Sequence, residues 1–199
     1  LEEINSIAKR HCLEEINIDK IEDEYIDLTR LKTFTIDEAK THEIDDAISI
    51  DIKNGKKIVW IHIADPSSFI KINSEIDIKA RKKATSIYLP DKVDLMIPAL
   101  VTEDLLSLKS GRLSPALSVA TEIGLNGEIV NYNITRSIIK VNYNLTYNDA
   151  DELIELKPPQ EEELSLLSQI MIKRYKWRSS NGAVMLEQPE GRLSYVNEE

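Results

Sequence analysis

The stretch Thr35-Ile-Asp-Glu-Ala-Lys-Thr-His-Glu-Ile-Asp-Asp46 runs directly into the apolar segment Ala47-Ile-Ser-Ile-Asp-Ile52. It brings within ten residues the carboxylates Asp37, Glu43, Asp45 and Asp46. Carboxylates this close repel one another at neutral pH, so they persist beside a core strand only if cations neutralise them or water surrounds them. Oxygen ligands in this number suit Mg²⁺ or Mn²⁺, and two such ions about 4 Å apart are common in phosphodiester chemistry.

The spacing of these carboxylates restricts how they could share a metal. In an extended chain successive side chains point to opposite faces, so Glu43 and Asp45 would share one face and Asp46 would take the other. Convergence on one centre therefore requires the backbone to leave strand geometry, or two ions reached from different sides. On spacing alone, a solvated acidic turn ahead of a strand is the favoured alternative.

Composition restricts the class of protein. The one cysteine, Cys12, excludes an internal disulfide framework and fits a reducing compartment. No run approaches the ~18 apolar residues of a membrane span, and no basic-then-apolar leader opens the chain. We therefore predict a soluble, cytoplasmic protein without a membrane partner.

The net charge of −10 is opposite to what binding to the phosphates of a nucleic acid requires. The excess of acid lies at the two ends, with 9 acids and 3 bases in residues 1–28 and 11 acids and 6 bases in residues 149–199. Residues 29–148 carry 15 acids and 16 bases. Cations bound at the acidic cluster would make this middle section distinctly positive.

The apolar pattern predicts an α+β fold, with a mixed or antiparallel sheet and helices packed against it. Residues 1–27 are predicted to be an acidic N-terminal helix and linker, ahead of one folded region over 28–199. Strands are expected at Ala47–Ile52 and Ile58–Ile63, joined by an Asn-Gly turn, and the second is apolar enough to be buried on both faces. A second hairpin is expected over 116–134, with a further strand at 137–141.

Helices are predicted over Ser74–Ala84, Asn148–Leu156 and Glu161–Trp177. His62 lies inside a core strand, which is typical of a packed, hydrogen-bonded histidine rather than a metal ligand. Asp65 precedes Pro66, a pattern that predicts a structural role in a turn.

Five motifs occur in order at short intervals: Thr35-Ile-Asp with Ile44-Asp-Asp-Ala47, Ile61-His-Ile-Ala-Asp-Pro66, Ala84-Thr-Ser-Ile-Tyr-Leu-Pro90, Met96-Ile-Pro98 and Leu105-Leu-Ser-Leu108. Together they resemble the amino-terminal half of the RNB catalytic domain of the ribonuclease II/R family. The resemblance implies that residues 28–199 form part of an RNB-like domain.

What the resemblance implies is a 3′-to-5′ exoribonuclease that hydrolyses single-stranded RNA to nucleoside 5′-monophosphates with Mg²⁺. It assigns Asp37, Glu43, Asp45 and Asp46 to the metal centre, and Asp45 and Asp46 as the catalytic pair, because the Ile-Asp-Asp-Ala frame fixes their alignment. Tyr88 would stack on a base near the RNA 3′ end, a role that needs only the flat face of its ring.

Two features depart from the family pattern. Glu43 stands where the family usually has aspartate, and its side chain reaches one methylene further. Three outcomes remain open: an intact Mg²⁺ site, a geometry that tolerates Mn²⁺, or a weaker site. The chain also carries no Ser-Pro-Ile-Arg-Arg-like motif, which supplies an arginine to the scissile phosphate, and no flanking RNA-binding barrels. We therefore expect the partners of this chain to include the missing C-terminal part of the domain. Two alternatives remain open, a non-catalytic RNA-binding relative and a metal-binding structural domain.

Overall fold

The computed structural model describes residues 2–3, 6, 25–89 and 92–186. Most of the predicted N-terminal helix and linker over 1–27 lies outside these residues. The strands and helices, in chain order, are β1 (Tyr25–Asp27), β2 (Thr33–Asp37), β3 (Asp46–Lys53), β4 (Lys56–Ala64), η2 (Pro66–Ser68), α2 (Glu75–Lys83), β5 (Ile87–Tyr88), β6 (Val93–Asp94), η3 (Leu100–Leu106), β7 (Leu113–Ile123), β8 (Ile129–Thr146), α3 (Tyr147–Leu156), η4 (Pro159–Glu161) and α4 (Glu162–Ser180). No helix among them combines the length and the apolar character needed to cross a membrane.

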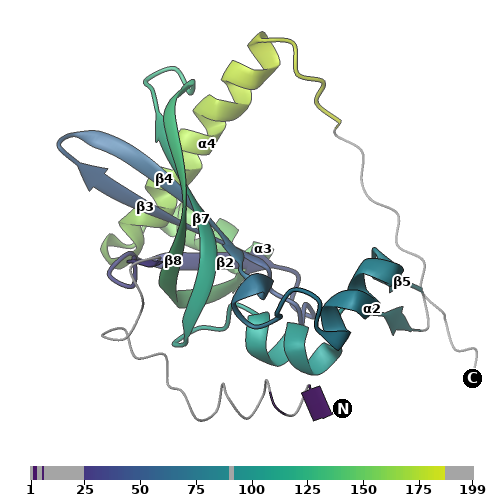
Figure 1. Ribbon diagram of the computed structural model, residues 1–199. Helices are drawn as coiled ribbons and strands as arrows, with labels where there is room; N and C mark the ends of the chain where they lie inside the picture. The colour runs from purple at the N-terminus through teal and green to yellow at the C-terminus, as the bar shows by residue number, and fades with distance from the viewer. Residues whose placement is uncertain (1, 4–5, 7–24, 90–91, 187–199) are drawn as a thin grey trace, which may run out of the picture.

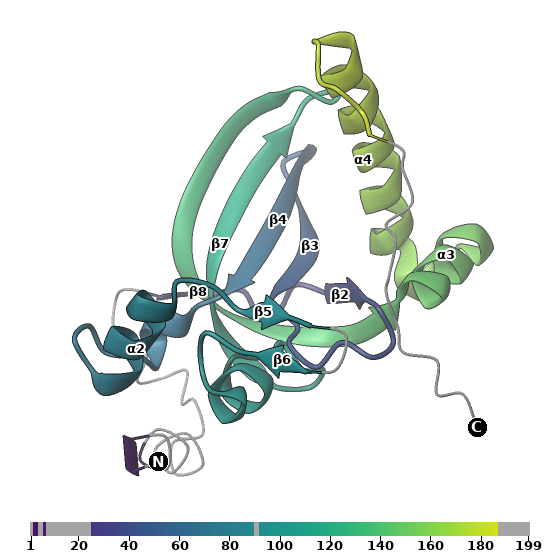
Figure 2. The ribbon, with the colours of Figure 1, turned by 90° about the vertical axis from the view of Figure 1, so that its right-hand side faces the viewer.

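Six strands form one mixed sheet in the order β1-β8-β2-β3-β4-β7, and β7 also pairs with β8, so this sheet closes on itself; β5 and β6 form a separate two-stranded sheet. The long strand β8 makes this closure possible. Its first half pairs antiparallel with β7, and its last residues pair parallel with β2. Figure 2 shows β8 curving around the sheet, with α3 and α4 on one side and α2 and the β5–β6 ribbon at the lower end of the strands. The predicted α+β class is confirmed.

The β3–β4 hairpin forms as predicted, in register from Asp46↔Ile63 to Lys53↔Lys56. Asn54 and Gly55 both have positive φ, 51° and 75°, which the right-handed twist of a two-residue hairpin favours. This hairpin places Asp46 at the end of the sheet away from the turn; residues 37–46, which carry the four carboxylates, are called the acidic loop below.

Two apolar clusters stabilise the sheet. The first lines its inner side and includes Trp60 of β4, Ile76 of α2 and Val101 of η3. The second fills the space between the outer side of the sheet and α4, where Phe34, Val59 and Leu167 are buried. Figure 1 shows α4 running along the sheet. Apolar side chains are therefore packed against both sides of the sheet.

Some predicted elements differ from the structure. The segment 58–63 is not buried on both faces: Ile61 and Ile63 are 40% and 42% exposed, because α4 covers the outer face only around Val59. Residues 137–141 are no separate strand but the middle of the continuous β8. Residues 25–27, expected to end the linker, form β1, which pairs with β8 over Arg136–Ile138.

His62 lies fully buried in a chain of polar side chains on the inner side of the sheet. Its Nε2 is 2.9 Å from Ser49 Oγ and its Nδ1 is 2.7 Å from Ser118 Oγ, which in turn is 2.6 Å from Ser137 Oγ. The ring uses both nitrogens on uncharged partners, so this histidine is structural, as predicted. Burial lowers the pKa of His62 to about 4.

This burial predicts a pH-dependent stability. The unfolded imidazole titrates near pH 6.5, so between about pH 4 and 6.5 the unfolded chain binds more protons than the fold. The contribution of His62 to the free energy of unfolding is therefore fully present above pH 6.5 and is lost as the pH drops towards 4. At pH 5 this loss is about 2 kcal/mol. Denaturant unfolding at pH 7.5 and 5.0 should show this loss in the natural sequence and not in His62→Gln. An identical pH dependence in both proteins would contradict it.

Candidate metal centre

The four predicted metal ligands are neighbours at one end of the β2–β3 pair, but among the described residues no three of them are close enough to hold one ion. Asp37 is the last residue of β2 and Asp46 is the first of β3, and these strands run antiparallel through Thr33↔Ser49 and Phe34↔Ile48. Residues 41–45 have no regular secondary structure. The backbone therefore leaves strand geometry, as convergence of Glu43, Asp45 and Asp46 requires.

Ser107 fixes the backbone of this acidic loop on both sides of Glu43. The serine is fully buried. Its Oγ donates to the His42 carbonyl and accepts from the Ile44 N–H, both at 3.1 Å. Backbone bonds from Leu108 N to Ile44 O (2.9 Å) and from Ala64 N to Asp45 O (2.8 Å) extend the attachment. The loop is thus tied to η3 and to the end of β4.

Sequence reasoning gave no role to Ser107, although it lies in one of the five motifs. A signal was present, because a serine inside the apolar run Leu105–Leu108 will be buried, and a buried hydroxyl needs hydrogen-bond partners. The two backbone groups that it satisfies lie more than sixty residues away in sequence, at separations of 63 and 65. Local sequence patterns do not identify partners at such distances.

Replacing Ser107 with alanine should leave the Ile44 N–H and the His42 carbonyl without their buried partner. We expect a loss of about 2 kcal/mol in the free energy of unfolding, since each buried unsatisfied polar group costs about 1–3 kcal/mol. Ser110→Ala is the matched control, because Ser110 is exposed and its hydroxyl donates to the Asn142 carbonyl. Chemical denaturation measures both variants, and equal small losses would refute the attachment role.

Electrostatics link the four carboxylates. Burial raises the pKa of Asp37, and the charges of Asp46 and Asp45 raise it further. Burial likewise raises the pKa of Asp45, with further contributions from Glu43 and Asp46. Each of the four carboxylates therefore interacts electrostatically with at least one other, and a cation bound here would reduce their repulsion.

The carboxylate of Glu43 is held asymmetrically. Its Oε2 accepts a hydrogen bond of 3.1 Å from the Tyr88 hydroxyl. Its Oε1 is shielded from solvent and has no hydrogen-bond partner among the residues described. Burial, the hydrogen bond to Glu43 and the charges of Glu43 and Asp45 raise the pKa of Tyr88, so its hydroxyl remains a donor. Tyr88 as a whole residue is 68% exposed.

The donor set fits a divalent cation by its chemistry. It consists of carboxylates, and the shielded Glu43 Oε1 is an unsatisfied acceptor of the kind that a cation would satisfy. Within the described part of the chain, however, no three His, Cys, Asp or Glu side chains are gathered closely enough to hold one ion. The four carboxylates are thus neighbours without forming a closed coordination sphere.

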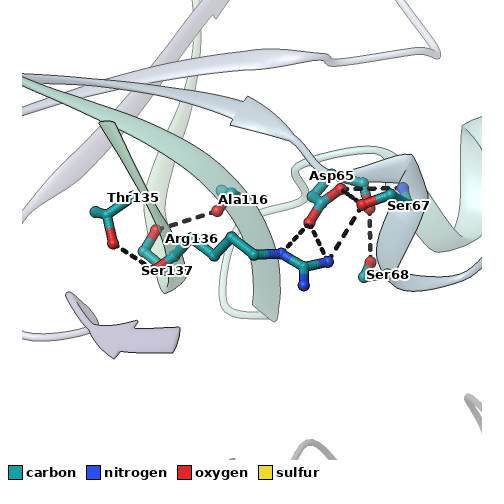
Figure 3. A network of polar contacts seen from close by, with 7 residues as sticks. All are labelled: Asp65, Ser67, Ser68, Ala116, Thr135, Arg136 and Ser137. Atoms are coloured by element: carbon teal, nitrogen blue, oxygen red, sulfur yellow. Dashed lines mark hydrogen bonds and ion pairs between the residues drawn. The ribbon is translucent and has the colours of Figure 1, made fainter. Parts of the chain in front are cut away.

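Asp65 holds the turn after β4, as its sequence context predicts. Its Oδ1 accepts from the Ser67 N–H at 3.0 Å and from the Ser67 hydroxyl at 2.5 Å. Arg136 of β8 donates to Asp65 Oδ2 from Nη2 (3.1 Å) and Nε (3.3 Å), and Figure 3 shows this network joining the turn to β8. The same guanidinium lies 4.7 Å from the Tyr25 ring centroid. The network joins the turn at η2 to β8 and brings Arg136 against Tyr25 of β1.

Comparison with known proteins identifies relatives of this chain. The sequence model of the RNB domain matches residues 25–199. An uncharacterized ribonuclease of Synechocystis sp. is 41% identical over 84% of this chain, and the chloroplastic/mitochondrial ribonuclease II of Arabidopsis thaliana is 37% identical over 100% of this chain. Ribonuclease R of Chlamydia muridarum is 32% identical over 99%. The chain spans about a quarter of each relative, 24–28% of its length.

Solved structures show the same fold. Mycoplasma genitalium RNase R, in complex with ribose-methylated single-stranded RNA, matches 97% of the chain with a TM-score of 0.80 at 20% identity, and the chain covers 31% of it. Yeast Ssd1, a pseudonuclease, matches 82% of the chain with a TM-score of 0.69 at 24% identity, and 20% of that protein is covered. With the domain match over residues 25–199, these likenesses establish that the chain belongs to the RNB-domain family of ribonucleases II and R.

Proposed function

We propose that this chain is the metal-bearing part of a Mg²⁺-dependent 3′-to-5′ exoribonuclease that hydrolyses single-stranded RNA to nucleoside 5′-monophosphates. The observation that carries the proposal is the set of four neighbouring carboxylates at the end of β2 and β3, whose charges raise the pKa values of Asp37 and Asp45, with the backbone on either side of Glu43 held by Ser107. Membership of the RNB family supplies the substrate class. Since the chain covers only part of its relatives, the proposal concerns the natural full-length polypeptide that contains it.

In this proposal the four carboxylates and Tyr88 have different roles in hydrolysis. Asp37, Glu43, Asp45 and Asp46 would hold the divalent cations, with Asp45 and Asp46 as the principal ligands. Bound cations would act as Lewis acids that stabilise negative charge on the phosphate under attack by water. The exposed ring of Tyr88 would receive a base near the 3′ end by stacking.

A direct test incubates the full-length protein with 5′-labelled single-stranded RNA and Mg²⁺. The expected result is progressive shortening of the RNA from its 3′ end with release of nucleoside 5′-monophosphates, and complete arrest in EDTA. Internal cleavage, or digestion that persists in EDTA, would contradict the proposal.

The alternative function is RNA binding without cleavage, and two observations favour testing it. One structural neighbour is a pseudonuclease, and the carboxylates here do not form a closed metal-binding group within the described residues. This alternative predicts RNA affinity that falls steeply with salt and no mononucleotide release in Mg²⁺ or Mn²⁺. The digestion assay above distinguishes it from the nuclease.

A further inference from the structure

Tyr88 and Glu43 are 45 residues apart in sequence, yet the tyrosine hydroxyl donates a 3.1 Å hydrogen bond to Glu43 Oε2. This contact uses the polar end of a side chain whose ring is largely exposed. Stacking on a base requires only the face of the ring. The hydroxyl therefore has a separate partner, and that partner belongs to the candidate metal centre.

The backbone that carries Tyr88 is held in place. Tyr88 lies in β5, which pairs with β6 through Ile87↔Asp94 and Tyr88↔Val93. Met96 N donates to Ser86 Oγ at 2.8 Å, and Lys83 Nζ at the end of α2 donates to the Leu95 carbonyl at 2.6 Å. These bonds tie the β5–β6 ribbon to α2, so the Tyr88 hydroxyl approaches Glu43 from an anchored position.

Glu43 needs such a restraint more than an aspartate would. Its side chain has one more rotatable bond, and fixing it in one rotamer costs conformational entropy. The Tyr88 bond occupies Oε2, and the other oxygen, Oε1, stays shielded and without a partner among the described residues. One oxygen is thus anchored, and the other is a shielded acceptor whose hydrogen-bonding capacity is unsatisfied among the described residues.

We propose that Tyr88 is a positioning residue for Glu43: its hydroxyl holds Oε2 so that Oε1 is presented to a divalent cation. This inference rests on the proposed function, because it assumes that Glu43 is a ligand. It gives Tyr88 two separable tasks, ring stacking with RNA and orientation of a carboxylate. Partners that orient a metal ligand in this way typically contribute about 10–100-fold to metal affinity.

The test is a double-mutant cycle on Mn²⁺ affinity, measured by the electron paramagnetic resonance of free Mn²⁺ with the full-length protein and no RNA. Tyr88→Phe keeps the ring and removes the hydroxyl, so Mn²⁺ binding should weaken about tenfold. Glu43→Asp withdraws the carboxylate from the reach of the hydroxyl. In that background, Tyr88→Phe should change the dissociation constant by no more than about twofold, because the coupling has already been lost.

Tyr143→Phe is the matched control, since the Tyr143 hydroxyl donates to the Glu161 carboxylate at 2.5 Å, away from the acidic loop. It removes the same type of bond and should leave Mn²⁺ affinity unchanged. RNA affinity in EDTA gives a second readout. Tyr88→Phe should stay within about twofold of the natural protein, whereas Tyr88→Ala should bind about tenfold more weakly because the stacking face is lost.

The outcomes separate the inference from the function on which it rests. If the natural protein binds no Mn²⁺, the proposed metal centre fails and the inference fails with it. If Mn²⁺ binds equally well to the natural protein and to Tyr88→Phe, only the positioning role is overturned. A tenfold effect of Tyr88→Phe that persists in the Glu43→Asp background would also overturn it, because the hydroxyl would then act through another group.

Discussion

Asp45→Asn is expected to reduce Mg²⁺-dependent RNA hydrolysis by about a thousandfold, the loss typical when a charged group that stabilises the transition state is removed. Asparagine keeps the volume of the side chain and one carbonyl oxygen, but it removes the negative charge that a cation needs. Initial rates of mononucleotide release from single-stranded RNA measure the effect. Asp151→Asn is the control, because Asp151 is exposed on α3 outside the acidic loop, and its rate should equal that of the natural protein.

Asp45→Asn should lose activity without losing thermal stability. Burial and the charges of Glu43 and Asp46 raise the pKa of Asp45, which means that the fold disfavours its ionised form. In EDTA, Asp45→Asn should therefore melt at a temperature no lower than the natural protein. Adding Mg²⁺ should raise the melting temperature of the natural protein and leave that of the variant nearly unchanged. A variant that is inactive because it is unfolded in EDTA would contradict this assignment.

Local sequence patterns were sufficient for the elements whose contacts are local. The Asn54-Gly55 turn predicted the β3–β4 hairpin, because both residues tolerate the positive φ that the turn requires. Ser74 predicted the start of α2, and its hydroxyl accepts from the Asp77 N–H at 3.3 Å. The acidic loop was found for the same reason, since its four carboxylates lie within ten residues of one another.

What the sequence could not provide depends on distant partners. Closure of the sheet requires the two ends of β8 to pair with β7 and β2, and no periodicity in residues 129–146 encodes that choice. The exposure of Ile61 follows from where α4 ends its contact with the sheet, not from the apolar run itself. The Tyr88–Glu43 bond likewise joins two segments that each had a different predicted role.

Gly127→Ala is expected to lower the free energy of unfolding by about 3 kcal/mol. Gly127 lies in the β7–β8 turn with φ of +94°, where an L side chain is strained by about 1 kcal/mol or more. A Cβ there would also lie 2.4 Å from the Lys173 carbonyl oxygen and 2.7 Å from Arg174 N, both in the backbone of α4. Because backbone cannot rotate away, the helix would have to move, and such overpacking typically costs about 1–3 kcal/mol.

Gly55→Ala separates the two contributions. Gly55 also has a positive φ, +75°, but a Cβ there would meet no atom within 4 Å, so only the backbone strain of about 1 kcal/mol applies. Denaturant unfolding of both variants isolates the cost of pushing the turn against α4. The Gly127 carbonyl also accepts from Arg174 Nη1 at 3.1 Å, so displacement of α4 would break a bond as well as create a clash. If the two alanine variants lose equal stability, the turn does not press on α4, and the close contact between hairpin and helix is not part of the fold in solution.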